Sequence, residues 1–281
     1  MSRCSTTNTP CIVALATALG LISAGCCKNV APDPAAEADA QFREELIRQF
    51  AVPAAVHAES WLDAPILQLK GDEISLEGTP CARLGSAMGT DECRIMLRNK
   101  GELWKQLYPG RAFPGVVVLV AGLDTPGEKV DAMAGAALKA GFPNLQVVVH
   151  GVKKGKLSAT SLGIAQVHLL ALNPGDPSAE PEGLRLVLGP ANMAMMSWEK
   201  GGGETDPAPV AMTEERRADG TIHLPGLVSA VGRLTTAHQG DKRVVVISGL
   251  QRVRLEKVVA IADVFSDPKT PYQVFWLVAA R

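Results

Sequence analysis

The stretch that decides the fold is residues 116–149, VVVLVAGLDTPGEKVDAMAGAALKAGFPNLQVVV. Its first apolar run, 116–120, lies between two glycines and is typical of a buried strand. Residues 125–128, Thr-Pro-Gly-Glu, have the pattern of a helix start, and Gly141 is a typical helix end. The run 146–149 predicts a second strand. The stretch therefore predicts a strand–helix–strand unit whose parallel strands are joined by a right-handed crossover.

The same pattern recurs 128 positions later. Val116–Val118 falls on Val244–Val246, and Glu128–Val130 falls on Glu256–Val258. Eight of the 21 positions from 116 to 136 are identical under this shift. Valine and alanine are common in the chain, but the repeated Glu-Lys-Val triplet is not a matter of composition. We therefore predict an internal duplication.

Two further pairs of segments extend the repeat. Gln146-Val147 meets Gln273-Val274 after a slip of one residue. Upstream, the turn in residues 71–78 has a similar segment in residues 219–226. On these matches, each copy would run from a hairpin through a strand and a helix to a final strand.

We accordingly expect an α+β fold made of two tandem small modules, each with helices packed on one face of a mixed four- to five-stranded sheet. The first module would span residues 64–172, with a hairpin at 66–78 and a helix at 94–107. The Pro- and Gly-rich residues 173–183 would link it to a second module at 184–281, in which residues 201–209 would form a long exposed loop.

Composition excludes several classes of protein. The chain has 281 residues, of which 47% are apolar, so it can bury a core and is not disordered throughout. Its 28 basic and 29 acidic residues leave a net charge of −1, which argues against a nucleic-acid partner. Beyond the N-terminus, no apolar run approaches the roughly 20 residues of a membrane-spanning helix.

The N-terminus indicates export. Residues 1–25 contain one arginine, an apolar centre and small residues at the end, as in a secretory signal peptide. Residues 22–26, Ile-Ser-Ala-Gly-Cys, resemble a bacterial lipobox, except that Ser23 stands where such signals usually have leucine. The resemblance implies that Cys26 carries lipid and becomes the mature N-terminus; ordinary cleavage without lipid is the alternative. Residues 26–63 would then be a tether that ends in a short helix.

Only two cysteines remain in the folded part. Cys81 and Cys93 would close a 13-residue loop as a disulfide in an oxidising compartment. The alternative, a metal site, lacks ligands nearby, because no histidine lies between His57 and His150.

The second half has, in this order, the segments 184–188, 196–198, 218–222, 244–247 and 273–278, and the first half has Val116–Val120, Asp124-Thr125-Pro126 and Ala140-Gly141-Phe142. In these residues and their order, the chain resembles the periplasmic domain of the ExbD/TolR group of bacterial proteins. The resemblance covers about residues 67–149 and 184–280. The second half has Arg252-Val253-Arg254 where the first has Asp-Thr-Pro.

The resemblance implies a binding role without the proton-coupled one. Members of that group carry an aspartate on an N-terminal transmembrane helix, and this sequence has no matching helix or carboxylate. We therefore expect a non-enzymatic lipoprotein that acts as a binding or scaffold component. It would face the periplasm, on the outer rather than the inner membrane. Its partners would be peptidoglycan, a second copy or another protein, bound through an open sheet edge. The alternatives are an accessory subunit of an ExbB/ExbD- or TolQ/TolR-type complex and a hydrolase.

No catalytic or metal-binding constellation stands out in the sequence, and no cofactor is expected. The five histidines, His57, His150, His168, His223 and His238, are not spaced as ligands, and His223 is expected to point outward from a strand. Asp124 and Glu128 are interpreted as helix-start residues. Three further features have structural interpretations: Gly201–Gly203 (a hairpin loop), Lys153–Lys156 (a solvated turn), and Met193, Met195, Met196 and Trp198 (strand packing).

Overall fold

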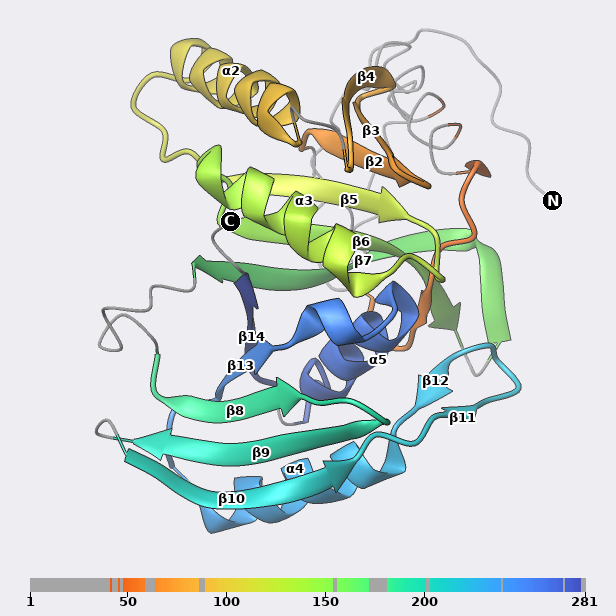
Figure 1. Ribbon diagram of the computed structural model, residues 1–281, viewed down its shortest axis with the longest axis vertical. Coiled ribbons are helices and arrows are strands. Elements are labelled where there is room, and N and C mark those ends of the chain that lie inside the picture. The colour runs from red at the N-terminus through yellow and green to blue at the C-terminus, as the bar shows by residue number, and fades with distance from the viewer. Residues whose placement is uncertain are drawn as a thin grey trace, which may run out of the picture. The chain divides into compact units, whose positions relative to one another are not determined.

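The computed structural model describes residues 41, 45, 48–58, 64–85, 89–153, 156–171, 181–200, 203–238, 240–269 and 271–278 (Figure 1). The expected signal peptide, the lipid site at Cys26, most of the expected tether and residues 173–180 of the expected linker lie outside the described residues. Among the described residues, no helix is both long enough and apolar enough to cross a membrane.

The fold is α+β, as expected. Its strands are β1 Ala54–Ala55, β2 Ile66–Lys70, β3 Glu73–Leu76, β4 Thr79–Arg83, β5 Val116–Ala121, β6 Asn144–Lys153, β7 Lys156–Ala171, β8 Gly183–Leu188, β9 Met193–Lys200, β10 Gly203–Ala211, β11 Glu215–Arg216, β12 Ile222–His223, β13 Val244–Ser248 and β14 Gln273–Val278. The helices are α2 Asp91–Leu107, α3 Gly127–Lys139, α4 Pro225–Ala237 and α5 Leu255–Phe265, with the short 3-10 helix η2 Leu250–Arg252.

The strand–helix–strand prediction is confirmed. β5 pairs in parallel with β6, with Val116 opposite Asn144, and α3 connects the two strands. The hairpin expected at residues 66–78 is present as antiparallel β2 and β3. The helix expected at 94–107 is α2, which begins three residues earlier.

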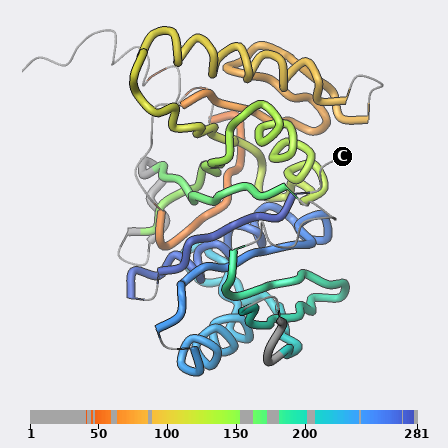
Figure 2. The backbone as a smooth tube through the Cα atoms, turned by 90° about the vertical axis from the view of Figure 1, so that its left-hand side faces the viewer, coloured from red at the N-terminus to blue at the C-terminus, as the bar shows by residue number. Residues whose placement is uncertain are grey.

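The strands do not form two separate small sheets. A single mixed sheet has the order β10-β9-β8-β13-β14-β7-β6-β5-β2-β3-β4, and β1 pairs with β6 beside it (Figures 1 and 2). The expectation of two independent sheets is wrong because of β7. This strand pairs antiparallel with β6 along one side and parallel with β14 along the other. It thereby covers two edges that would otherwise be open.

The pairing pattern nevertheless occurs twice. In the first half, the order is β4-β3-β2-β5-β6; in the second, it is β10-β9-β8-β13-β14. In each half the first three strands are antiparallel neighbours, and the last two pairs are parallel. The register corrects two of the alignments. Asn144, not Gln146, occupies the position of Gln273, and the counterpart of the β2–β3 hairpin is β8–β9. Residues 219–226 instead follow β11 and form β12 and the start of α4.

The expected loop at residues 201–209 is largely the edge strand β10. It pairs with β9 from Gly203 to Ala211, with an irregularity between Thr205 and Ala208. Its two prolines, Pro207 and Pro209, suggested a loop in the sequence. Proline is accepted in an edge strand, however, because the N–H that it lacks need not face a neighbouring strand.

One core joins both halves. Alternate residues of the strands and the inner faces of all four helices form a continuous cluster of buried side chains, including Leu119, Leu186, Leu97, Val258 and Trp276. A smaller apolar cluster lies on the other side of the first half's strands and includes Val52, Ile66 and Val118. The helices therefore cover one face of the sheet.

Candidate functional site

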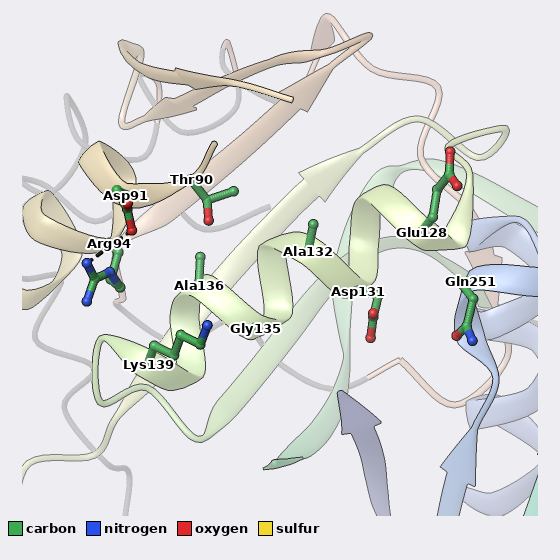
Figure 3. A pocket seen from close by; sticks show the side chains of 10 residues that line it. All are labelled: Thr90, Asp91, Arg94, Glu128, Asp131, Ala132, Gly135, Ala136, Lys139 and Gln251. Atoms are coloured by element: carbon green, nitrogen blue, oxygen red, sulfur yellow. Dashed lines mark ion pairs between the residues drawn. The ribbon is translucent and has the colours of Figure 1, made fainter. Parts of the chain in front are cut away.

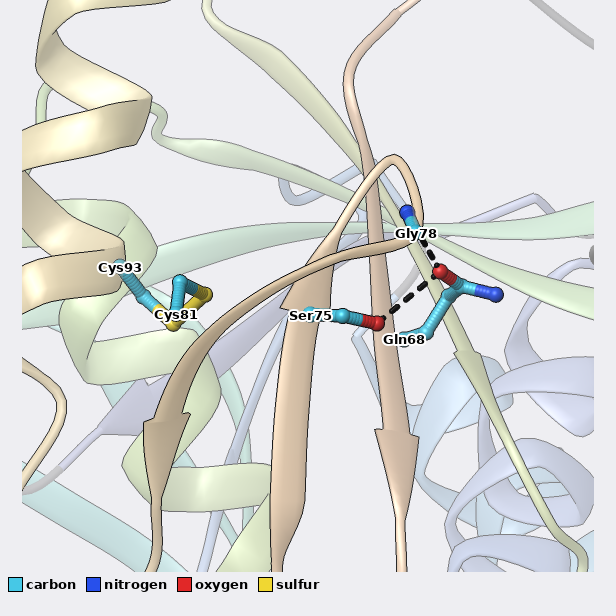
Figure 4. The surroundings of a disulfide bond; sticks show 5 residues. All are labelled: Gln68, Ser75, Gly78, Cys81 and Cys93. Carbon is cyan, nitrogen blue, oxygen red and sulfur yellow. Dashed lines mark hydrogen bonds between the residues drawn. A yellow bond between two sulfur atoms is a disulfide. The ribbon is translucent and has the colours of Figure 1, made fainter.

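A disulfide fixes the outer edge of the first half. Cys81 in β4 and Cys93 in α2 are bonded, with their Cα atoms 4.9 Å apart, and both side chains are buried (Figure 4). Nearby, the Gln68 side-chain oxygen accepts hydrogen bonds from the Ser75 hydroxyl (3.0 Å) and from the backbone N–H of Gly78 (2.9 Å). These contacts tie together β2, β3 and the turn before β4. They hold the edge strand and α2 in place, which is a structural role.

The two halves meet where their second helices begin. Pro126 forms a bridge with Arg254, the residue 128 positions later. On either side of it, the Gly127 N–H donates to the Val253 carbonyl (2.7 Å), and the Leu255 N–H donates to the Thr125 carbonyl (2.9 Å). The same shift of 128 relates the two hydrogen bonds. The junction therefore has local twofold symmetry, and backbone atoms form it.

The lysine of the repeated Glu-Lys-Val triplet, Lys129 or Lys257, contacts the turn of the first hairpin in each half. Lys129 Nζ lies 2.7 Å from an Asp72 carboxylate oxygen and donates to the Gly71 carbonyl (2.9 Å), so it holds the β2–β3 turn. Lys257 Nζ donates to the Asn192 side-chain oxygen in the β8–β9 turn and to the Met212 carbonyl, both at 2.8 Å. Lys129 lowers the pKa of the Asp72 carboxyl by hydrogen bonding and charge. The Glu-Lys-Val repeat is thus an anchor for each half's first hairpin.

Charged side chains surround the start of α5. The buried Glu256 carboxylate accepts two hydrogen bonds from the Arg216 guanidinium, at 2.7 and 2.9 Å, and these raise the pKa of Arg216. Arg254 pairs with Asp124 (3.1 Å) and Glu214 (3.6 Å). Asp124 is therefore an ion-pair partner at the junction, which agrees with its interpretation as a structural residue.

A small polar cavity lies along α3. It has a volume of about 150 Å³, and Figure 3 shows Asp91 and Arg94 reaching it from α2 and Glu128, Asp131 and Lys139 from α3. Arg94 and Asp91 form an ion pair at 3.0 Å. The cavity is much smaller than the cleft between α4 and α5, and its charges are of mixed sign, so it does not select a ligand of one charge.

A larger cleft opens between α4 and α5, with a volume of about 520 Å³. Arg217 and His223 line it and are joined by a hydrogen bond of 2.8 Å between Arg217 Nη2 and His223 Nδ1. Asp263 and Asp267 come from α5 and the turn after it. Apolar side chains line the space between these groups: Ile222, Val228, Val231, Ala260 and Val264. The cleft therefore presents both signs of charge around an apolar surface.

The segment after β1 forms part of this cleft. The Asp263 carboxylate accepts hydrogen bonds from the backbone N–H groups of His57 (2.7 Å) and Val56 (3.2 Å). His57 Nδ1 also lies 3.2 Å from Asp263 Oδ1. Asp263 thus fixes the segment after β1 against α5, whereas the Asp267 carboxylate accepts a hydrogen bond from the backbone N–H of Lys269 (2.9 Å).

The cavity on α3 and the cleft on α5 occupy equivalent positions. Under the shift of 128, Ala132 falls on Ala260 and Gly135 falls on Asp263. Ala132 and Gly135 line the cavity on α3, and Ala260 and Asp263 line the cleft on α5. The second half therefore has a carboxylate where the first half has only a glycine hydrogen. The Asp263 carboxylate is what allows the second half to hold Val56 and His57, in the segment after β1.

The five histidines lie in three different environments. His57 and His223 share the cleft, although His223 was expected simply to point outward. His150 and His168 lie in the adjoining strands β6 and β7, where burial lowers the pKa of each imidazole. His238 stacks on Trp198 with ring centroids 4.4 Å apart. Among the described residues, no three histidine, cysteine or carboxylate side chains are placed to hold a metal ion.

The outer edges of the sheet are poorly suited to pairing with a partner strand. The two end strands are β4 and β10. Pro80 lies in β4, and Pro207 and Pro209 lie in β10. Each proline removes one backbone donor. On the methionine-rich strand β9, Met196 and Trp198 are buried as expected, whereas Met193 and Met195 are exposed.

Sequence reasoning missed the cleft. Its titratable residues lie at positions 57, 217, 223, 263 and 267, which no local spacing connects. The only signal was the recurrence itself, since Gly135 and Asp263 are one of the positions at which the repeated helices differ in charge. No family model matches the chain, and no curated protein matches it.

Proposed function

We propose that the protein is a non-enzymatic, lipid-anchored component of a bacterial cell envelope, built from two ExbD/TolR-like modules that pair within one chain. The repeated strand order and the twofold junction between Gly127 and Leu255 support the duplication. The lipobox-like residues before Cys26 support the anchor. The modules share one sheet through β7, so they would act as a single rigid body.

The observation that carries the binding role is the cleft between α4 and α5. A guanidinium and carboxylates within one cleft fit a ligand that bears both an amine and a carboxylate. The apolar surface between them suits a short aliphatic side chain. The stem peptides of peptidoglycan have this chemistry, so we propose the cell wall as the ligand. Edge-strand pairing is a weaker candidate, because prolines lie in both end strands.

Retention on purified peptidoglycan sacculi tests this proposal. The cleft variants are Arg217→Glu and Asp267→Lys, which reverse one charge of each sign in the cleft. The matched control is Arg233→Glu, which reverses an exposed charge on α4 outside the cleft. We expect each cleft variant to lower retention at least about tenfold, as loss of a charged contact does, and the control to retain normally. Equal retention of all four proteins would refute the proposed ligand.

The lipid anchor needs a separate test. Metabolic labelling with radioactive palmitate should mark the wild-type chain and not a Cys26→Ser variant. A wild-type chain that takes up no label would refute the anchor. Co-purification of a membrane channel protein with the wild-type chain would instead support the accessory-subunit alternative.

A further inference from the structure

Three large apolar side chains are exposed together near the C-terminal end of α2. Leu103, Leu107 and Tyr108 have 50%, 63% and 44% of their surface exposed. All three line a groove of about 260 Å³. A cluster of this kind is unusual on a protein surface that faces only water, and it marks an interaction surface.

Aromatic rings support the groove. Trp104 packs against Tyr108 and Phe113, with ring centroids 5.1 and 5.5 Å apart, and Phe113 packs edge-on against Phe142 at 5.2 Å. All four line the groove. Trp104 and Phe113 are only partly buried. Tryptophan and tyrosine combine an apolar ring with a polar group, and they favour the boundary between lipid and water.

The surroundings of the groove are basic, although the whole chain has a net charge of −1. Residues 98–111 contain four basic side chains and one acidic, a local charge of +3 (4 − 1). Lys100 pairs with Glu77 at 2.6 Å, and including that carboxylate leaves +2. The Lys105 ammonium, which also pairs with Glu102 at 2.8 Å, lies 5.7 Å from the centre of the Phe113 ring, and the Arg111 guanidinium lies 5.7 Å from the centre of the Tyr108 ring. Positive charge is therefore held directly beside the apolar groups.

We propose that this groove is a membrane-contact surface, which inserts Leu103, Leu107 and Tyr108 into the headgroup region of an anionic bilayer. A phospholipid surface matches each feature: its phosphates would pair with the cations, its boundary with water would hold the aromatic rings, and its acyl chains would surround the leucines. The inference rests on the proposed function in one respect, since a lipid anchor would keep the groove close to a bilayer. It assigns the first half to the membrane and leaves the cleft of the second half for the wall.

Vesicle co-sedimentation of the unacylated mature chain tests the surface apart from the anchor. The protein is residues 26–281 with Cys26→Ser and Cys27→Ser, mixed with vesicles of phosphatidylglycerol and phosphatidylethanolamine. We expect it to bind these vesicles, to bind pure phosphatidylcholine vesicles at least about tenfold more weakly, and to dissociate as salt is raised. Failure to bind the anionic vesicles would overturn the proposal while leaving palmitate labelling of the wild-type chain untouched.

Substitutions locate the binding surface. Leu103→Glu combined with Leu107→Glu should lower partitioning at least about tenfold. Replacing both leucines with alanine should give a smaller loss, because that change removes apolar contact without adding negative charge. The control is Ile95→Glu, an equally exposed residue (52%) of the same helix, about 12 Å along its axis and outside the groove. If Ile95→Glu lowered vesicle binding as much as the double variant does, the assignment of the binding surface to the groove would be refuted.

Discussion

Replacing Gly127 with alanine should open the junction between the two halves. Gly127 is the first residue of α3, and its N–H donates to the Val253 carbonyl. A methyl group at this position would lie 2.8 Å from the Leu250 carbonyl carbon and closer still to two carbonyl oxygens. Ordinary contacts begin at 3.4 Å. The opposing backbone would therefore have to move by at least about 0.6 Å (3.4 − 2.8), because no flexible side chain can yield instead.

The cost can be worked from the contacts that this movement strains. Two backbone hydrogen bonds cross the junction beside Gly127, and each contributes a net of about 1 kcal/mol. Forcing a methyl group into a close-packed site costs a further ~1–3 kcal/mol. We expect Gly127→Ala to lower the free energy of unfolding by about 3–5 kcal/mol. For a domain of this size, that corresponds to a Tm lower by about 6–20 °C.

Thermal unfolding followed by circular dichroism measures the effect, and Gly232→Ala is the matched control. Gly232 lies inside α4, is exposed, and has open space where a methyl group would go. Alanine there should raise stability by about 0.5–1 kcal/mol, because it favours the helix. The two glycine-to-alanine changes should therefore shift Tm in opposite directions. If Gly127→Ala left Tm within about 2 °C of wild type, the close contact between α3 and η2 would be refuted.

Three other outcomes are expected. Replacing Cys81 and Cys93 with serine should lower the free energy of unfolding by about 3 kcal/mol, measured by urea denaturation; an unchanged midpoint would contradict this. Lys257→Met should cost about 3 kcal/mol, since it leaves the half-buried Glu214 carboxylate and the buried Met212 carbonyl without their cation. The equivalent Lys129→Met, at a more exposed site, should cost about 1 kcal/mol or less, so equal losses would be inconsistent with the contacts. Finally, burial lowers the pKa of His168 below 6.5, so below that pH the unfolded chain binds the proton more readily. Stability should therefore be full above pH 6.5 and fall on acidification, by less in His168→Gln than in wild type.

The parts of the fold that sequence predicted are those set by local pattern. The run 116–120, the helix start at 125–128 and the end at Gly141 depend on neighbours a few positions away, and all three are where the pattern placed them. The Glu-Lys-Val repeat also identified equivalent helices correctly. Its lysine contacts, to Asp72 in one half and Asn192 in the other, could not be inferred, because the turns that they hold differ in length.

The parts that sequence did not predict depend on long-range pairing. The 16-residue strand β7 has no unusual composition, yet it joins the two halves by pairing with β14, more than 100 positions away. The sequence alignment placed Gln146 on Gln273 because the two residues are identical. In the sheet, however, Asn144 lies opposite Val116 as Gln273 lies opposite Val244, so Asn144 is the residue equivalent to Gln273. Identity in valine-rich strands is a weak guide to register, because many shifts bury the same residue types.

The twofold junction also explains how the halves could acquire different surfaces. The hydrogen bonds of the junction are made by backbone atoms, and the only requirement on a side chain is that residue 127 has none. Substitutions elsewhere on the helices therefore leave the pairing intact. In one half, Asp263 stands where the other has Gly135 and holds Val56 and His57 beside the cleft, while the disulfide and the apolar groove belong to the other half. Because the two surfaces share no residues, their substitutions should act independently. Leu103→Glu with Leu107→Glu should lower vesicle binding without changing retention on sacculi, and Arg217→Glu should do the reverse. A variant that weakened both equally would show that the two halves form one binding surface.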